Sequence, residues 1–187
     1  MILPVYLYGQ PVLRQETEEI TPDYPDLKKL IADMYETMYA SDGVGLAAPQ
    51  IGLPIRLIVI DADVLKDTFP ELEGIKLTLI NPELDVLEDG PKVSRAEGCL
   101  SVPGLSENVV RHEKVLLNWL DENFEEHEQV FEGFLSRIIQ HEYDHLEGTL
   151  YVDRVSPIRK QLIRGKLNNI AAGKVRCDYK VKQVKKH

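Results

Sequence analysis

The stretch Gln140-His141-Glu142-Tyr143-Asp144-His145-Leu146-Glu147-Gly148 contains the pattern His-Glu-x-x-His. In a helix, His141 and His145 lie on one face, about one turn or roughly 5.4 Å apart along the axis. Two imidazoles at this spacing can bind one metal ion, and Glu142 beside them is a candidate general base. Two core histidines with satisfied hydrogen bonds would be the structural alternative. The stretch therefore predicts a metal-binding helix.

The residues around this pattern support a helix. Apolar side chains recur at spacings of three, four and seven, at Phe134, Leu135, Ile138, Ile139 and Leu146. They form two adjacent stripes, so we expect the helix to be buried on most of its surface. The stripe through Phe134 and Ile138 continues into the two histidines, which therefore point toward the core. Gly148 supplies a stop at the C-terminal end.

Length and composition are those of one globular domain. The 187 residues are 43% hydrophobic and 28% charged, which allows one sizeable core. Since no repeat or linker marks a second unit, we expect one catalytic domain over residues 1–187. No apolar run approaches the roughly 20 residues of a membrane span, and Pro4 interrupts an uncharged N-terminus that does not resemble a signal peptide. Two cysteines are too few for a disulfide framework, so we expect a cytoplasmic protein. We also expect no membrane or DNA partner.

The net charge of −9 is unevenly distributed along the chain. Residues 159–187 contain ten Lys or Arg and one acidic residue, a net charge of +9, so that residues 1–158 carry −18. A basic C-terminal segment could contact an anionic partner such as RNA. A solvated helix face followed by a lysine-rich terminus is the structural alternative.

Outside the central helix, the sequence predicts an α+β fold. Helical periods predict helices from about residue 26 to 41 and from residue 157 to about 172, the second capped by Ser156. Apolar runs and alternation predict strands at residues 55–60, 76–81, 115–120, 127–132 and 175–182. Residues 82–92 suggest a hairpin or loop, and residues 61–74 a surface excursion. We expect mixed, mainly antiparallel sheets packed around the central helix.

Two histidines do not hold a catalytic metal, because such sites use three protein ligands and keep a position open for water. Downstream candidates are poor, since His187 is at the terminus and Glu147 and Asp153 lie too close to the helix. Upstream, Cys99 lies in Glu97-Gly98-Cys99-Leu100-Ser101. A thiolate with two imidazoles suits a first-row transition metal. Cys99 could equally be a plain buried cysteine.

A third stretch, Gly43-Val44-Gly45-Leu46-Ala47-Ala48-Pro49-Gln50, combines small residues with one polar side chain. Its closely spaced glycines allow a backbone to approach another group tightly. The spacing is wrong for a phosphate loop. A simple turn between helix and strand is the default interpretation, with Gln50 the one polar side chain after Asp42.

Residues 43–50, 97–101 and 140–148 together resemble the peptide deformylase family in sequence, order and separation. The resemblance extends from the N-terminal arm to the helix after Ser156, and the cysteine is similar to the bacterial form. The end of the chain departs from the best-known members, because Gly173 ends the helix and a strand-like tail follows, as in a second bacterial subgroup.

The resemblance implies an enzyme that removes the formyl group from the formyl-methionine of nascent polypeptides and releases formate. It implies one divalent metal on Cys99, His141 and His145, typically Fe²⁺, with Zn²⁺, Ni²⁺ or Co²⁺ able to substitute. Glu142 would take a proton from the attacking water and later protonate the leaving amine. The side-chain amide of Gln50 would help to stabilise the oxyanion.

The resemblance also assigns the remaining site residues. The backbone N–H of Leu100 would be a second oxyanion donor. Substrate would bind in an extended form along Val44 and Gly45, and Leu135 and Ile138 would join Val44 as pocket walls.

Further implications concern supporting residues and partners. Glu97 and Arg111 would brace the cysteine loop, with a weak surface ion pair as the alternative. Asp144 is either a support for the ligands or a capping residue. The partners are formylmethionyl nascent peptides, with ribosome contact through the basic C-terminal segment, and we expect a monomer.

Two other functions fit parts of the pattern. A zinc peptidase would need a third ligand, Glu or His, downstream of His145, and no suitable residue is found there. A non-catalytic, ribosome-associated metal-binding module would need a defect at Glu142 or Gln50, and both residues are present.

Overall fold

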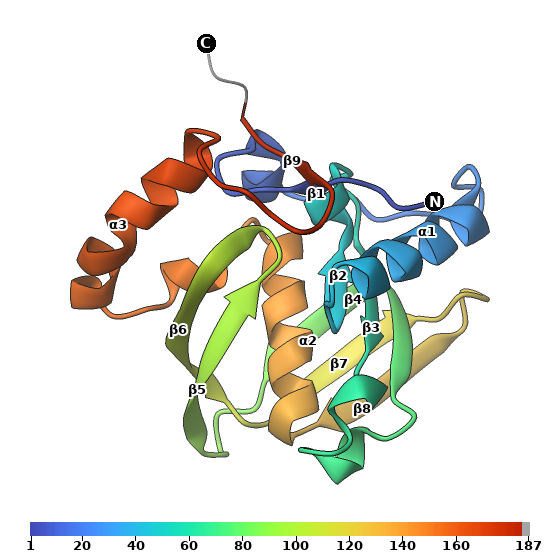
Figure 1. Cartoon of the computed structure of the whole chain (residues 1–187). Coiled ribbons are helices and arrows are strands. Elements are labelled where there is room, and N and C mark those ends of the chain that lie inside the picture. Colours follow the sequence, from blue (N-terminus) through green and yellow to red (C-terminus); the bar gives the residue numbers. More distant parts are fainter. Residues whose placement is uncertain (185–187) are drawn as a thin grey trace.

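The computed structural model describes residues 1–184 and has an α+β fold (Figure 1). The described residues form the helices α1 (Leu27–Ala40), α2 (Gly133–Leu146) and α3 (Pro157–Ala171). None of these helices is long and apolar enough to cross a membrane. In Figure 1, α2 runs through the middle of the molecule, with strands on both sides of it.

The strands form three sheets in the described part of the chain. An antiparallel sheet contains, in spatial order, β2 (Gly45–Ala47), β3 (Leu57–Asp61), β4 (Lys76–Val86), β7 (Val115–Leu120) and β8 (Glu126–Phe131). A separate antiparallel hairpin pairs β5 (Lys92–Cys99) with β6 (Val102–His112). A short parallel pair joins β1 (Val5–Tyr6) to β9 (Val181–Lys182). Helix α2 therefore lies between the five-stranded sheet and the hairpin.

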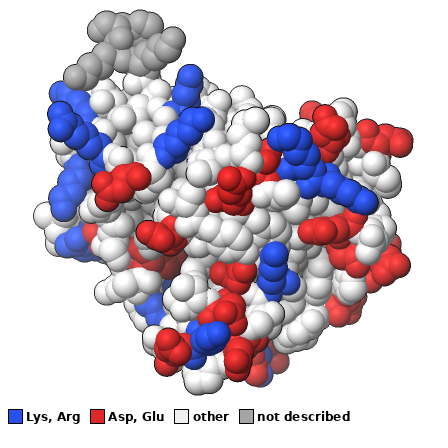
Figure 2. All heavy atoms as spheres, turned by 45° about the vertical axis from the view of Figure 1, so that its right-hand side comes forward, with Lys and Arg blue, Asp and Glu red and all other residues white. Residues whose placement is uncertain are grey.

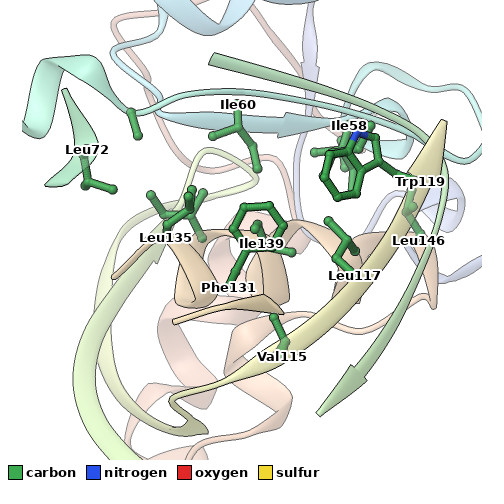
Figure 3. Close-up of a cluster of buried hydrophobic side chains, with 14 residues drawn as sticks. Ile58, Ile60, Leu72, Val115, Leu117, Trp119, Phe131, Leu135, Ile139 and Leu146 are labelled. Carbon is green, nitrogen blue, oxygen red and sulfur yellow. The ribbon is translucent and has the colours of Figure 1, made fainter. Parts of the chain in front are cut away.

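The core between α2 and the five-stranded sheet holds the helix in place. Figure 3 shows side chains from β3 and β7 around Leu135 and Ile139 of α2. Ile58 and Ile60 of β3 and Leu117 of β7 are fully buried in this cluster. Because residues two apart on a strand share a face, alternate residues of these strands supply the apolar surface that α2 covers.

A second cluster covers the opposite face of the same sheet. Ile31, Met34 and Met38 of α1 pack against Leu57 and Val59 of β3. Strand β3 is thus buried on both faces, which explains its unbroken apolar run. A third cluster lies beneath α3 and the chain termini, and includes Val5, Leu7, Tyr151, Ile163 and Ile170.

The structure confirms the predicted helices. Helix α1 ends at Ala40, and α3 begins at Pro157 with the hydroxyl of Ser156 accepting a hydrogen bond from the Arg159 N–H at 3.4 Å. Gly148, beyond the end of α2, adopts φ of +68°, as expected for a glycine that ends a helix. The strands predicted at residues 115–120 and 127–132 correspond to β7 and β8.

Some of the predictions outside the helices were incomplete or wrong. The prediction of a hairpin or loop at residues 82–92 is wrong for its first part, because β4 continues to Val86 through a bulge between Ile80 and Glu83 and pairs with β7. Strands β5 and β6 were not predicted at all. Of the strand expected at residues 175–182, only Val181–Lys182 pairs as β9. The surface excursion at residues 61–74 also contains two fully buried side chains, Ala62 and Leu72.

The packing predicts a large difference between two Leu→Ala substitutions. Leu117→Ala removes a fully buried side chain of the core between α2 and the sheet, so the free energy of unfolding should fall by about 2–5 kcal/mol. Leu162→Ala makes the same chemical change on α3, where the side chain is 63% exposed, and should change it by less than about 0.5 kcal/mol. Urea unfolding of both variants measures this difference. Equal losses would contradict the described core.

Candidate metal centre

Three metal-ligating side chains converge beside α2. One donor atom from each of Cys99, His141 and His145 lies within 4.8 Å of the other two. Cys99 ends β5, where the hairpin register shifts between Glu97 and Cys99, and the two histidines lie on α2. The Cys99 sulfur is 3.4 Å from Nε2 of His145. Spacing along the chain left Cys99 undecided as a ligand. The structure places it beside the two histidines, as the family resemblance implies.

The orientation of His141 is set by Glu97. Nδ1 of His141 is 2.8 Å from Oε1 of Glu97. An imidazole that donates from Nδ1 to a carboxylate keeps a lone pair on Nε2 for a metal. Burial opposes ionisation of Glu97, but hydrogen bonds from His141 and Arg111 outweigh it and lower the pKa of Glu97 to about 2. Glu97 is therefore a carboxylate at neutral pH.

A buried ion network surrounds Glu97. Arg111 donates to both carboxylate oxygens of Glu97, at 2.7 and 2.9 Å, and to Asp144 at 3.0 Å. Arg154 donates two further hydrogen bonds to Asp144, at 2.7 and 2.8 Å. The Glu97–Arg111 pair is thus buried and is not a weak surface ion pair. Asp144 belongs to the same network.

Arg137 completes the network from α2. Its guanidinium donates to Glu97 at 2.5 Å and to the carbonyls of Val109 at 2.9 Å and Val93 at 2.6 Å. One helix residue therefore contacts both strands of the hairpin that carries Cys99. Sequence analysis did not assign a role to Arg137, although a charged residue next to the apolar stripe of a buried helix was a usable signal.

Gln50 lies next to the sulfur of Cys99. It belongs to the 3₁₀ turn η2 (Ala48–Ile51) and is almost completely buried. Its side-chain oxygen accepts from the Ala47 N–H at 3.0 Å, so its NH₂ group points away from that strand. The NH₂ nitrogen is 3.4 Å from Sγ of Cys99 and 3.2 Å from Oγ of Ser101. Gln50 therefore directs its amide donor into the site.

Glu142 is buried at the same site and packs against Gly45. A Cβ on Gly45 would lie 2.8 Å from both Cγ and Oε1 of Glu142, closer than atoms pack. Burial raises the pKa of Glu142 to about 7. Among residues 1–184, the buried Oε2 of Glu142 has no hydrogen-bond partner. Gly45 thus leaves room for a carboxylate whose second oxygen is free to bind another group.

Gln50, Cys99, His141 and Glu142 line one cavity of about 580 Å³. Of the expected substrate residues, Val44, Gly45 and Ile138 line it, as does Leu100. Leu135 is not among the lining residues and is buried in the core cluster instead. Phe134 lines the cavity from the same turn of α2.

Further walls come from segments that sequence analysis did not connect with the site. Residues 176–179, which follow α3, line the cavity, as do residues 102–105 of β6. The apolar alternation at residues 175–182 indicated that this segment packs against the protein. Nothing in the sequence indicated that its partner is the wall of this cavity.

The donor set fits a divalent transition metal. One thiolate and two imidazoles leave a fourth position for water or substrate, which is the arrangement of catalytic sites. Sulfur and imidazole nitrogen favour first-row transition metals over Mg²⁺ or Ca²⁺. The fixed Nδ1 of His141 provides the outer support that metal-ligating histidines need.

Comparisons with known proteins agree on one family. The family model described as polypeptide deformylase matches residues 2–161. The chain is 48% identical to the peptide deformylase of Flavobacterium psychrophilum, covering 100% of this chain and 99% of that protein. It is 49% identical to that of Flavobacterium johnsoniae, with coverages of 97% and 96%. The crystal structure of the Thermus thermophilus peptide deformylase superposes with a TM-score of 0.79 at 38% identity, over 90% of this chain and 97% of that one.

The geometry predicts that metal binding depends on Cys99, His141 and His145 and not on histidines outside this site. Cys99→Ala or His145→Ala should weaken binding of one divalent ion by more than about 100-fold, since losing only an outer support of a ligand costs about 10–100-fold. His127→Ala is the matched control, because His127 is exposed and bonded to Asp121. Equilibrium dialysis with Zn²⁺ measures all three. Unchanged affinity in Cys99→Ala would contradict the site.

Proposed function

This chain belongs to the peptide deformylase family, and we propose that it performs the reaction of that family at Cys99, His141, His145 and Glu142. It is an enzyme that removes the N-formyl group from nascent polypeptides. The observation that carries the proposal is the convergence of Cys99, His141, Glu142 and Gln50 on one cavity, with His145 beside Cys99. The peptidase alternative lacks a downstream third ligand.

Cys99, His141 and His145 would hold the metal. When bound there, a divalent ion lowers the pKa of a water molecule and polarises the formyl oxygen. We propose Fe²⁺ as the physiological ion, on the strength of the family resemblance, with Zn²⁺, Ni²⁺ or Co²⁺ as substitutes. The thiolate and imidazole donors support this set of ions, because they suit all four of them.

Glu142 acts as the general base and then as the general acid. Its buried carboxylate takes a proton from the attacking water and later gives a proton to the leaving amine. Gly45 supports this role, because the absence of a side chain there lets the carboxylate lie against β2. The free Oε2 of Glu142 supports it as well, since it is available to accept the proton.

Gln50 and Leu100 stabilise the negative charge that develops on the formyl oxygen. The Gln50 amide is held by its bond from Ala47 and needs no reorientation during the reaction. The backbone N–H of Leu100, next to Cys99, is the second donor. Preorganised donors of this kind typically contribute about 10²–10³ in rate each.

The substrate lies extended along Val44 and Gly45, with its methionine side chain against Ile138. Val44 and Ile138 line the cavity and supply apolar surface for this side chain. Leu135 contributes indirectly, through the core cluster that it shares with Ile138. Residues 1–187 would act as one catalytic domain, since the cavity has walls from both halves of the chain.

We further propose that the enzyme is a cytoplasmic monomer that works at the ribosome. Formylated nascent chains emerge there. Lys and Arg side chains gather along the left edge of the face in Figure 2, whereas acidic side chains predominate on its right. A basic surface of this kind is attracted to RNA. Lys185 and Lys186, which belong to the basic segment, lie outside the described residues.

The mechanism predicts the effects of two substitutions on formate release from a formyl-methionyl peptide by the Fe²⁺-loaded enzyme. Glu142→Ala should lower kcat by about 10²–10⁴-fold and retain the metal. Gly45→Ala should lower kcat by roughly 10–100-fold, because its Cβ displaces the Glu142 carboxylate.

Gly165→Ala is the matched control for Gly45→Ala. No heavy atom lies within 4 Å of the position that its Cβ would occupy, so kcat should stay unchanged. A fully active Glu142→Ala enzyme would rule out the proposed base. An inactive but metal-replete wild type would rule out the reaction itself.

The proposed ribosome contact predicts that the enzyme no longer co-sediments with ribosomes when the charge of the basic C-terminal segment is reversed. Changing Lys180, Lys182, Lys185 and Lys186 to Glu should abolish co-sedimentation with ribosomes at low salt, where electrostatic attraction is strongest. A variant that reverses Lys28, Lys66, Lys92 and Lys114 makes the same change in net charge elsewhere and should still co-sediment. Unchanged co-sedimentation of the tail variant would exclude this contact.

A further inference from the structure

One wall of the catalytic cavity is built by residues that the family model does not reach. The model ends at residue 161, but Arg176, Cys177, Asp178 and Tyr179 line the same cavity as Gln50, Cys99 and Glu142. The established reaction assigns no role to this segment. The contacts between residues 176–179 and the loop after Cys99 indicate a role in the reaction.

The segment is held against the molecule by the N-terminal arm. After α3, Gly173 turns the chain with φ of +70°. The chain then pairs in parallel with the arm, where the Val5 N–H donates to the Lys180 carbonyl at 2.9 Å and the Leu7 N–H to the Lys182 carbonyl at 3.0 Å. The two ends of the described chain therefore form one ribbon, which we call the terminal ribbon (residues 5–8 and 179–182).

The terminal ribbon donates hydrogen bonds to two successive carbonyls next to the metal ligand. The Tyr179 hydroxyl donates to the Leu100 carbonyl at 2.6 Å. The Tyr8 N–H donates to the Ser101 carbonyl at 2.8 Å. The ring of Tyr179 packs in the cluster that also contains Leu100 and Cys99. The loop Cys99–Ser101 is thus fixed from outside as well as by the metal site.

This loop has three functions within the proposed mechanism. Cys99 is a metal ligand, the Leu100 N–H is an oxyanion donor, and the Ser101 hydroxyl accepts from the Gln50 amide at 3.2 Å. Small errors in the position of such groups lower the rate strongly. A hydrogen bond that fixes the Leu100–Ser101 peptide therefore acts on catalysis and not only on stability.

We propose that Tyr179 is a positioning residue of this deformylase, whose hydroxyl holds Leu100 in the orientation that stabilises the oxyanion. The inference rests on the proposed role of Leu100. Tyr179 does not touch the reacting atoms, and it acts through the backbone of Leu100. Residues beyond the family model would then contribute to the rate of the reaction.

The test compares Tyr179→Phe with the wild type, both loaded with the same metal. The Phe variant keeps the packed ring and removes only the hydroxyl. Loss of one neutral hydrogen bond should lower kcat for a formyl-methionyl peptide by roughly three- to tenfold. KM and metal content should stay unchanged, because the ring of residue 179 remains in the cavity wall and the three ligands are intact. In ¹⁵N-labelled protein, the Leu100 N–H should change its chemical shift, because the hydrogen bond to its own residue's carbonyl is lost.

Tyr35→Phe is the matched control. The Tyr35 hydroxyl lies 2.9 Å from the Thr78 hydroxyl, and neither residue lines the catalytic cavity. This variant loses a comparable hydrogen bond and should keep the wild-type kcat and the wild-type Leu100 signal.

Two results would overturn the inference while leaving the proposed function in place. One is an active wild type with an unchanged kcat and an unchanged Leu100 N–H in Tyr179→Phe. The other is a loss of kcat that is matched by loss of metal, which would show a purely structural role. If the metal-replete wild type released no formate, the proposed function would fail, and the inference would fail with it.

Discussion

The site depends on the buried carboxylate of Glu97. It binds Arg111 from β6, Arg137 from α2 and the ring of His141, and so joins the hairpin to the central helix. Arg111 also reaches Asp144 of α2, and Arg137 also reaches the hairpin carbonyls, but Glu97 is where both arginines and a metal-ligating histidine meet. Because an isolated buried carboxylate is strongly unfavourable, the three donors and the carboxylate require one another. The same contact therefore orients a metal ligand and holds two layers of the fold together.

The guanidinium groups of the network hold its carboxylates in fixed positions. Arg111 and Arg137 are buried against Glu97, and the half-exposed Arg154 pairs with Asp144. Bidentate guanidinium contacts also fix orientation, which a point charge would not do. The network thus fixes the geometry of the site.

Sequence periodicity was sufficient for the central helix, because a helical period and a metal-binding spacing coincide on one face. It could not select Cys99, since spacing along the chain carries no information on distance across the fold, and the resemblance to a family was needed. The resemblance in turn placed Leu135 in the pocket, whereas the structure has Phe134 there. Two adjacent apolar stripes both predict burial, and only tertiary packing decides which of them faces the cavity.

The hairpin escaped detection for a physical reason. The inward positions of β6 are occupied by Leu105, Glu107, Val109 and Arg111, all buried. Buried charges at every second inward position remove the apolar alternation by which strands are recognised. These are the residues that connect β6 to its neighbours, Arg111 to Glu97 and Glu107 to Arg159. The polar contacts that position the metal ligands are thus also what hides this strand in the sequence.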